Sequence, residues 1–437
     1  MIWNPALESL PRDSMRAMQL ERLRAAVAWA GERVPFYRNA LAEAGVEPST
    51  LKSLEDLERL PFTRKAHLRE HYPWGLFAVP QSQLARIHAS SGTKGKPTVV
   101  GYTRNDLLIW REVMARSLAA GGAEPGQLIQ IAYGYGLFTG GLGFHDGAEH
   151  MGLTVVPVSS GNTLRQILLL QDFRPQGLAC TPSFALHIGE TMREQGIDPR
   201  SVGLRYGLLG AEPWTEGLRR QIEALWGIHA VDFYGLSEII GPGVATECAE
   251  GRDGLHVNED HFLPEVVDPG TGEPLPAGTE GELVLTCLTK RALPILRYRT
   301  GDVTRLDFEP CRCGRTTVRM ARIKGRTDDM LVIKGVNVYP SQLEAALLTL
   351  PDLAPHYQLV VDRGKGFPTI EVHVEPSEER VRAWGGFDSA RPEVVALSLR
   401  VGELLRAHLG LNPEVAIVPP KTIPRSEGKA VRVVERS

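Results

Sequence analysis

The sequence of 437 residues lacks any apolar run approaching the roughly 20 residues that a membrane-spanning helix needs. Its opening stretch, MIWNPALESLPRDSMR, lacks the basic-then-apolar pattern of a secretory signal. The sequence also lacks an excess of charge of one sign, because its 49 Lys and Arg nearly balance its 52 Asp and Glu and leave a net charge of −3. No basic run is interleaved with aromatic residues. These absences argue against a membrane or nucleic acid as partner and predict a soluble, cytoplasmic protein.

Cysteine is scarce, and its odd number of five argues against a disulfide framework. Three of the cysteines, together with a histidine, supply the donor set of a closed structural zinc site, namely Cys248, His256, Cys311 and Cys313. The pair in EPCRCGRT is more closely spaced than in a CxxC motif, so reduced thiols without metal are the alternative. Zinc held there would join two loops and take no part in catalysis.

The sequence also lacks a Walker phosphate loop, although the stretch ASSGTKGKPT (Ala89–Thr98) resembles one in composition. Gly92 and Gly95 enclose two residues where the Walker pattern needs four, and Pro97 follows the lysine. Consecutive small residues nevertheless expose main-chain N–H groups, and the hydroxyls of the segment add donors for anionic oxygens. The stretch therefore predicts a phosphate loop of another kind, with an ordinary polar turn as the alternative.

The length and the 43% hydrophobic content predict two or more folded domains. From Leu128 onward, short apolar runs that end in Gly, Pro or Ser alternate with helical stretches, which predicts parallel strands with helical crossovers. Ligands in such sheets collect at the carboxyl ends of the strands. Three loops fall there, at residues 133–136, 210–213 and 234–238. Beyond Gly254 a β-rich, turn-rich subdomain is expected, and the last hundred or so residues predict a small α+β domain.

Six motifs in one order carry a resemblance: SSGTKGKPT, LLGAEPW, DFYGLSE, YRTGD, KGRTDDMLVIKGVNVYPSQLE and PRSEGKAVRV. From about residue 88 to its end, the chain resembles the adenylate-forming superfamily of acyl-CoA synthetases. AYGYGLFTGGLGFHDGAEH and YGLSEIIGPGV resemble, more narrowly, its phenylacetate–CoA ligase family. The resemblance implies an α/β N-terminal domain over residues 1–327 that binds ATP and the acid. It also implies a small mobile C-terminal domain over residues 328–437 that carries a catalytic lysine.

The implied function is an ATP-dependent ligase that converts an aryl acid, with phenylacetate expected, to its CoA thioester through an acyl-adenylate, releasing AMP and pyrophosphate. ATP, Mg²⁺ and coenzyme A follow as cofactors or co-substrates, and a homodimer is compatible with the resemblance. Adenylation of a deazaflavin coenzyme, or loading of an acid onto a carrier protein, is an alternative on the same fold. A nucleotide-binding regulator without turnover is the alternative from another class.

The resemblance also implies a nucleotide site in which the loop after Ala89 holds the departing β and γ phosphates. Tyr234 would flank the adenine, and Asp302 would accept hydrogen bonds from both ribose hydroxyls, because a carboxylate offers two acceptor oxygens. Arg326 would add a cation near the ribose and phosphate. The complete set of implied nucleotide-binding residues is Ser90, Ser91, Gly92, Thr93, Gly95, Gly210, Ala211, Glu212, Pro213, Asp232, Tyr234, Ser237, Asp302 and Arg326.

Catalysis is implied for Lys429, which would reach the carboxylate and the α-phosphate, and for Arg326. Glu238 would be a catalytic Mg²⁺ ligand, because a carboxylate is the hard oxygen donor that magnesium accepts. Asp328 matches the hinge of the mobile domain, and Gly335 matches a glycine that lets the pantetheine arm of CoA pass close to the backbone.

The acid pocket is expected in AYGYGLFTGG and the segment that follows it. Tyr135 and Phe138 would be aromatic walls beside glycines, which suits a flat ring. His145 would lie close by, with a structural histidine as the alternative.

Overall fold

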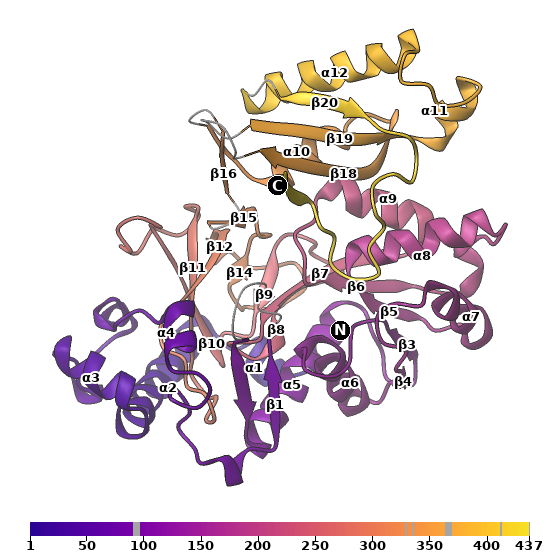
Figure 1. Cartoon of the computed structure of the whole chain (residues 1–437). Coiled ribbons are helices and arrows are strands. Elements are labelled where there is room, and N and C mark those ends of the chain that lie inside the picture. Colours follow the sequence, from indigo (N-terminus) through magenta and orange to yellow (C-terminus); the bar gives the residue numbers. More distant parts are fainter. Residues whose placement is uncertain (91–96, 328–329, 334–335, 363–368, 411–412, 437) are drawn as a thin grey trace. The chain divides into compact units, whose positions relative to one another are not determined.

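The computed structural model describes residues 1–90, 97–327, 330–333, 336–362, 369–410 and 413–436 (Figure 1). The chain divides into a first unit, made of Met1–Cys180, Ser201–Ala211 and Ile228–Arg322, and a second unit, made of Thr181–Arg200, Glu212–Gly227 and Ile323–Ser437. Among the described residues, none of the helices combines the length and the apolar composition that crossing a lipid bilayer requires. The domain boundary between residues 327 and 328 stays a prediction.

A nine-stranded sheet in the first unit has the order β13-β14-β9-β8-β7-β6-β5-β3-β4. Its strands are β3 (Leu128–Ile131), β4 (Thr154–Val156), β5 (Gly177–Cys180), β6 (Tyr206–Gly210), β7 (His229–Leu236), β8 (Gly241–Glu247), β9 (Leu255–Val257), β13 (Leu306–Asp307) and β14 (Arg319–Met320). The strands from β4 to β7 pair in parallel, and those from β7 to β13 pair antiparallel. Every residue of β5 and β6 is buried, as in parallel sheets covered on both faces. The predicted α/β class is confirmed.

The helices of the first unit are α1 (Pro5–Glu8), α2 (Arg12–Arg33), α3 (Pro35–Glu43), α4 (Lys65–Glu70), α5 (Arg104–Ala120), α6 (Thr139–Met151) and α7 (Thr163–Phe173). α6 packs against α5 although its sequence is rich in glycine, a poor helix former. A Cβ on Gly143 would lie 2.6 Å from the Trp110 ring, and one on Gly147 would lie 2.3 Å from the Cβ of Met114. These glycines therefore let the two helices approach closely, and burial of Trp110 compensates for their low helix propensity.

Antiparallel strands complete the first unit. β1 (Arg86–Ala89) and β2 (Val99–Tyr102) form one pair, and β10 (Phe262–Val267), β11 (Gly281–Cys287) and β12 (Tyr298–Thr304) hydrogen bond in that order. The turn after β10 begins where the Asp268 carboxylate accepts hydrogen bonds from the N–H groups of Gly270 and Thr271, both at 2.8 Å. Strands and turns beyond Gly254 agree with the predicted β-rich subdomain.

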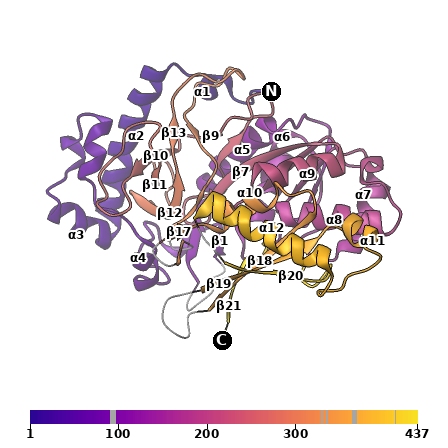
Figure 2. The same cartoon turned by 90° about the horizontal axis from the view of Figure 1, so that it is seen from above.

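The second unit contains a four-stranded sheet in the order β20-β19-β18-β21. Its described elements are α8 (Pro182–Glu194), α9 (Glu216–Trp226), β15 (Gly325–Arg326), β16 (Leu331–Ile333), β17 (Val336–Val338), α10 (Pro340–Leu347), β18 (Leu353–Asp362), β19 (Thr369–Pro376), α11 (Glu378–Ala383), α12 (Pro392–Leu409), β20 (Glu414–Ile417) and β21 (Val433–Arg436). α10 and α12 contact each other and cover one face of this sheet (Figure 2). The predicted C-terminal α+β architecture is confirmed.

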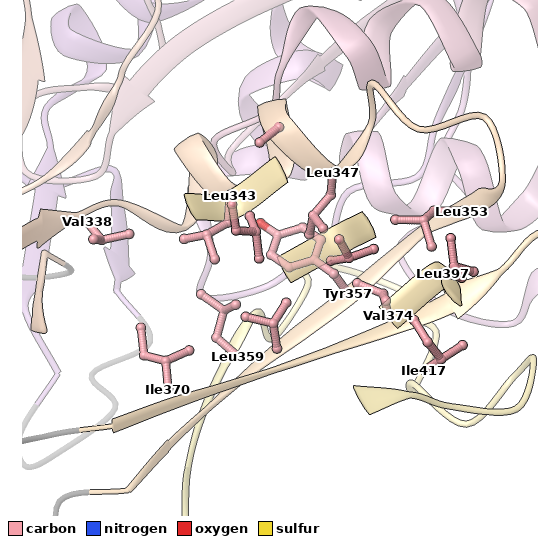
Figure 3. Packing of buried hydrophobic residues seen from close by; sticks show 14 of the residues in the cluster. Val338, Leu343, Leu347, Leu353, Tyr357, Leu359, Ile370, Val374, Leu397 and Ile417 are labelled. Carbon is pink, nitrogen blue, oxygen red and sulfur yellow. The ribbon is translucent and has the colours of Figure 1, made fainter. Parts of the chain in front are cut away.

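The core between these helices and the sheet follows directly from the sequence periods (Figure 3). α12 buries apolar residues three or four apart, as an amphipathic helix does. In β18, alternate residues from Tyr357 to Val361 are buried, and in β19 those from Ile370 to Val374, because side chains of a strand alternate between its faces.

The close approach of α5 and α6 predicts that Gly147→Ala lowers the free energy of unfolding by about 1–3 kcal/mol through overpacking. Gly140→Ala in the same helix is the control, because its added Cβ would have its nearest neighbour at 3.4 Å, an ordinary contact. We expect the control to change stability by less than about 0.5 kcal/mol. Urea unfolding followed by circular dichroism measures both variants, and equal stabilities would contradict the packing described.

Candidate active site

The carboxyl ends of β3, β5 and β6 meet at the Tyr133 side chain. Its hydroxyl donates to the carbonyl oxygen of Cys180 and accepts from the N–H of Gly210 at 3.2 Å. Gly210 pairs with Phe233 of β7, and a Cβ on Gly210 would lie 2.5 Å from the Phe233 carbonyl oxygen. Two of the three predicted ligand loops therefore lie side by side, and sheet packing alone requires a glycine at position 210.

The next residue, Ala211, has a φ of 66°, in the left-handed region that residues other than glycine rarely adopt. Such strain persists only where the surroundings impose it, and it gathers at functional sites. On β7, Asp232 lies with its carboxylate 3.6 Å from the guanidinium of Arg322, which also reaches Glu247 at 3.7 Å. The predicted nucleotide residue Asp232 thus takes part in an ion-pair network.

Tyr234 and Asp302, assigned to adenine and ribose, are brought together by β7 and β12. The Tyr234 hydroxyl donates to the Asp302 carboxylate at 2.5 Å. Asp302 is only 7% exposed, and its N–H donates to the Thr300 hydroxyl at 3.0 Å. The two residues are 68 positions apart in the sequence. The bond orients one carboxylate oxygen of Asp302 and holds the Tyr234 ring beside it.

Glu238 lies just after β7 and is 6% exposed. The Tyr298 hydroxyl lies 3.4 Å from its carboxylate. The loop is held by a buried cation, since the Lys290 ammonium donates to the carbonyl oxygen of Ile239 at 2.8 Å and lies 4.6 Å from the centre of the Tyr102 ring. Burial lowers the pKa of Lys290. Sequence reasoning missed Lys290, which stands in no motif.

The predicted acid-binding residues divide into a pair and a separate side chain. The Tyr135 hydroxyl lies 3.2 Å from Nδ1 of His145, and His145 also contacts Glu149 at 3.1 Å. Burial raises the pKa of Tyr135 above its ordinary value. Phe138, at the N-cap of α6, is 51% exposed and can present a ring to a ligand. Ser237, a predicted nucleotide-binding residue, belongs to the loop of residues 234–238, and its hydroxyl lies 3.2 Å from the Thr139 hydroxyl.

The phosphate loop is described only at its edge. The N–H of Ser90 donates to the carbonyl oxygen of Thr98 at 2.9 Å, which brings the two ends of the loop together. The Ser90 hydroxyl is buried and has no hydrogen-bond partner among the residues that the structure describes. The other predicted residues of this loop, and those of the hinge and CoA passage, lie outside the described residues, namely Ser91, Gly92, Thr93, Gly95, Asp328 and Gly335.

In the second unit, Lys429 belongs to a turn that we call the lysine loop, residues 426–430. The Ser426 hydroxyl donates to the Lys429 carbonyl oxygen at 2.8 Å and accepts from the Gly428 N–H at 3.1 Å. Just before the loop, Arg425 forms a two-point ion pair with Glu375, a fully buried residue of β19. These bonds fix both the shape of the loop and its attachment to the sheet.

Two side chains that precede α8 and α9 reach the lysine loop within the same unit. The Thr181 hydroxyl donates to the Gly428 carbonyl oxygen at 2.8 Å. The Glu212 carboxylate accepts from the N–H of Ala430 at 2.8 Å and, through its other oxygen, from the N–H of Ser183 at 2.8 Å. Sequence reasoning placed Glu212 at the nucleotide through its main chain and missed Thr181. Pro213 follows Glu212, and Arg326 ends β15.

The four predicted zinc ligands lie together in the first unit although they span 66 positions. Their ligand atoms all lie within 4.8 Å of one another. Sγ of Cys248 is 3.7 Å from Sγ of Cys311, and Sγ of Cys313 is 3.4 Å from Nε2 of His256. Tetrahedral zinc with sulfur at about 2.3 Å would place two sulfurs about 3.8 Å apart. The other ring nitrogen of His256 contacts the Thr317 hydroxyl at 3.1 Å, an arrangement that orients a metal ligand.

Comparisons with known proteins concern the chain as a whole. A family model described as AMP-binding enzyme matches residues 15–286, and one described as AMP-binding enzyme C-terminal domain matches residues 335–437. Phenylacetate-coenzyme A ligase from Thermus thermophilus is 56% identical over 99% of this chain and 99% of that protein. The Escherichia coli protein of the same name is 47% identical over 98% of this chain and 96% of that protein.

A crystal structure of 2-hydroxyisobutyryl-CoA ligase in the postadenylation state, in complex with R3-HIB-AMP, has a TM-score of 0.93 and 31% identity. The match covers 100% of this chain and 92% of that one. Sequence and fold thus agree over nearly the whole length, and the chain belongs to the phenylacetate–CoA ligase family of adenylate-forming enzymes.

Proposed function

We propose that this chain is an ATP-dependent ligase that converts an aryl acid, with phenylacetate as the expected acid, to its CoA thioester. The observation that carries the proposal is the 56% identity, over nearly full length, to a relative named phenylacetate-coenzyme A ligase. The bond between Tyr234 and Asp302 and the closed lysine loop add support, because they hold in place the groups assigned to the ribose and to the charge that develops in the first step.

In the first step, a carboxylate oxygen of the acid attacks the α-phosphorus of ATP. The bond from that phosphorus to the bridging oxygen breaks, and pyrophosphate leaves with the electron pair. Lys429 lies against the carboxylate and α-phosphate and neutralises charge as it develops, Arg326 adds a cation near the ribose and phosphate, and the loop after Ala89 binds the departing phosphates. Asp302 binds the ribose hydroxyls. These residues orient two anionic reactants that would otherwise repel each other.

Glu238 is the residue that would hold Mg²⁺. Its carboxylate fits the ion, because it is a hard oxygen donor held in place by a loop that the buried Lys290 fixes. When bound, Mg²⁺ supplies neutralisation of the phosphate charge.

In the second step, the CoA thiol loses its proton, and its sulfur attacks the carbonyl carbon of the acyl-adenylate. The bond from that carbon to the phosphate oxygen breaks, and AMP leaves. Gly335 would line the CoA passage and Asp328 would be the hinge. For the acid, Tyr135 and Phe138 supply aromatic surface, and the bond of Tyr135 to His145 orients its ring.

The proposed function is tested by measuring acid-dependent exchange of pyrophosphate into ATP with benzoate, phenylacetate, hydroxyphenylacetate and medium-chain fatty acids. CoA-dependent thioester formation is then measured with the acids that support exchange. We expect phenylacetate to give the highest kcat/KM and to yield its thioester. Exchange without thioester formation would indicate a carrier protein or deazaflavin acceptor, and absence of exchange with every acid would contradict the proposal.

Lys429→Ala should reduce acyl-adenylate formation by about 100-fold or more, because the developing charge loses a positioned cation. Lys421→Ala is the matched control, since this exposed lysine of the same unit pairs with Glu194 on the surface. The control should keep the wild-type rate. Quenched-flow measurement of acyl-AMP decides, and equal rates for Lys429→Ala and wild type would disprove the assigned role.

A structural zinc ion is a second part of the proposal. Cys248, His256, Cys311 and Cys313 form its donor set, and the sulfur spacing fits tetrahedral coordination. Gly251 contributes space, because a Cβ there would lie 2.7 Å from Sγ of both Cys248 and Cys311. The ion would join the loop after β8 to the loop before β14 and would stabilise the fold without entering the reaction.

Metal analysis of freshly purified protein should therefore find about one zinc per chain. Cys311→Ser should lose the metal and lower the thermal midpoint by several degrees, whereas Cys287→Ala, which removes a buried cysteine outside the cluster, should retain it. A wild-type protein free of zinc, or a Cys311→Ser variant that retains it, would refute the site.

A further inference from the structure

The lysine loop is held from two sides, and the holding groups flank Lys429. One position before the lysine, the Gly428 carbonyl oxygen accepts from Thr181, and one position after it, the Ala430 N–H donates to Glu212. Both bonds are 2.8 Å long. Because the peptide groups on both sides are fixed, the direction in which the lysine side chain leaves the backbone is fixed as well.

Glu212 uses both carboxylate oxygens for main-chain donors. One donor is Ala430, and the other is Ser183 in the first turn of α8, where N–H groups lack partners within the helix. An acidic group near a helix N-terminus is also favoured by the helix dipole. The bond to Ser183 therefore fixes the orientation of the carboxylate relative to α8, and the bond of its other oxygen to Ala430 fixes the lysine loop in turn.

Thr181 is bound in a similar way. It is the N-cap of α8, and its hydroxyl accepts from the N–H of Phe184 at 3.3 Å while donating its proton to Gly428. Thr181 is a buried residue, 5% exposed, so water competes little for these bonds. Both contacts to the lysine loop thus come from groups that the start of α8 already holds in position.

The loop also has bonds of its own. Ser426 closes the turn internally, and Glu375 anchors the preceding residues by accepting from Arg425 and from the N–H groups of Lys421 and Ile423. The Ser426 hydroxyl binds Gly428 and Lys429 within the turn, whereas the bonds of Glu375 lie before the turn. On the carboxyl-terminal side, Ala430 is held by Glu212.

We propose that Glu212 and Thr181 are positioning residues that place Lys429 for acyl-adenylate formation. They touch no reacting atom and act through the lysine loop. Their effect on the rate can still be large, because a displacement of about 1 Å at a catalytic group can cost about 100-fold in rate. The inference rests on the proposed function, in which Lys429 serves the first half-reaction and the thioester-forming step proceeds without it.

The test uses Glu212→Gln and Thr181→Val in the full-length chain and measures the two half-reactions separately. Ser183 and Ala430 donate to different carboxylate oxygens of Glu212, and glutamine replaces one of these acceptors with an NH2 donor, so one of the two bonds is lost. Valine removes the hydroxyl while keeping the shape of threonine. We expect the kcat of phenylacetate-dependent pyrophosphate exchange to fall about 10- to 100-fold in each variant, with the KM for ATP unchanged. Thioester formation from synthetic phenylacetyl-adenylate and CoA should keep the wild-type rate.

Glu194→Gln is the matched control, because Glu194 on α8 pairs with Lys421 at an exposed position of the same unit. It should match wild type in both half-reactions. Wild-type exchange kinetics in both test variants would overturn the inference. An equal loss of rate in both half-reactions would also overturn it, because it indicates misfolding. So would a raised KM for ATP at unchanged kcat, because it indicates a role in nucleotide binding. If none of the acids supports pyrophosphate exchange by the wild-type protein, the proposed function fails, and this outcome is distinct from the others.

Discussion

Parallel pairing of β5, β6 and β7 is the constraint on which the arrangement of the chemical groups depends. The register sets Cys180 opposite Leu209 and Gly210 opposite Phe233, so β5 and β6 end at neighbouring levels, and β7 continues beyond them to Leu236. The chain leaves β5 at Thr181 and leaves β6 at Ala211. β5 and β6 are short and fully buried, and a slip of one residue would turn every one of their side chains to the other face of the sheet.

Charged side chains hold the loops of the site through main-chain groups. Lys290 binds the carbonyl oxygen after Glu238, Glu375 accepts from two N–H groups before the lysine loop, and Glu212 accepts from two more. Each charge is buried or half-buried and would be costly if left unpaired. The same bonds that satisfy the charges also restrict the backbone, so local stability and the geometry needed for chemistry have a common origin.

The sequence was sufficient to predict the elements whose signal is local. Apolar runs ending in Gly, Pro or Ser marked β3 to β6, and the set of three cysteines and one histidine that the fold brings together was recognisable from residue types. The contacts of Glu212 and Lys290 could not be predicted, because they join positions 218 and 51 apart and no spacing rule links them. The glycines of α6 were likewise uninformative until Trp110 and Met114 were seen against them.

The two groups that Glu212 accepts from are both backbone amides, and this has a consequence for how the chain can vary. Every amino acid except proline supplies such a donor, so positions 183 and 430 can drift in evolution while the anchorage survives. Selection at these two sites therefore acts against proline more than in favour of any particular side chain. In a comparison of related sequences, the two donor positions would therefore show almost no preference for a residue type, whereas position 212 would retain its acid.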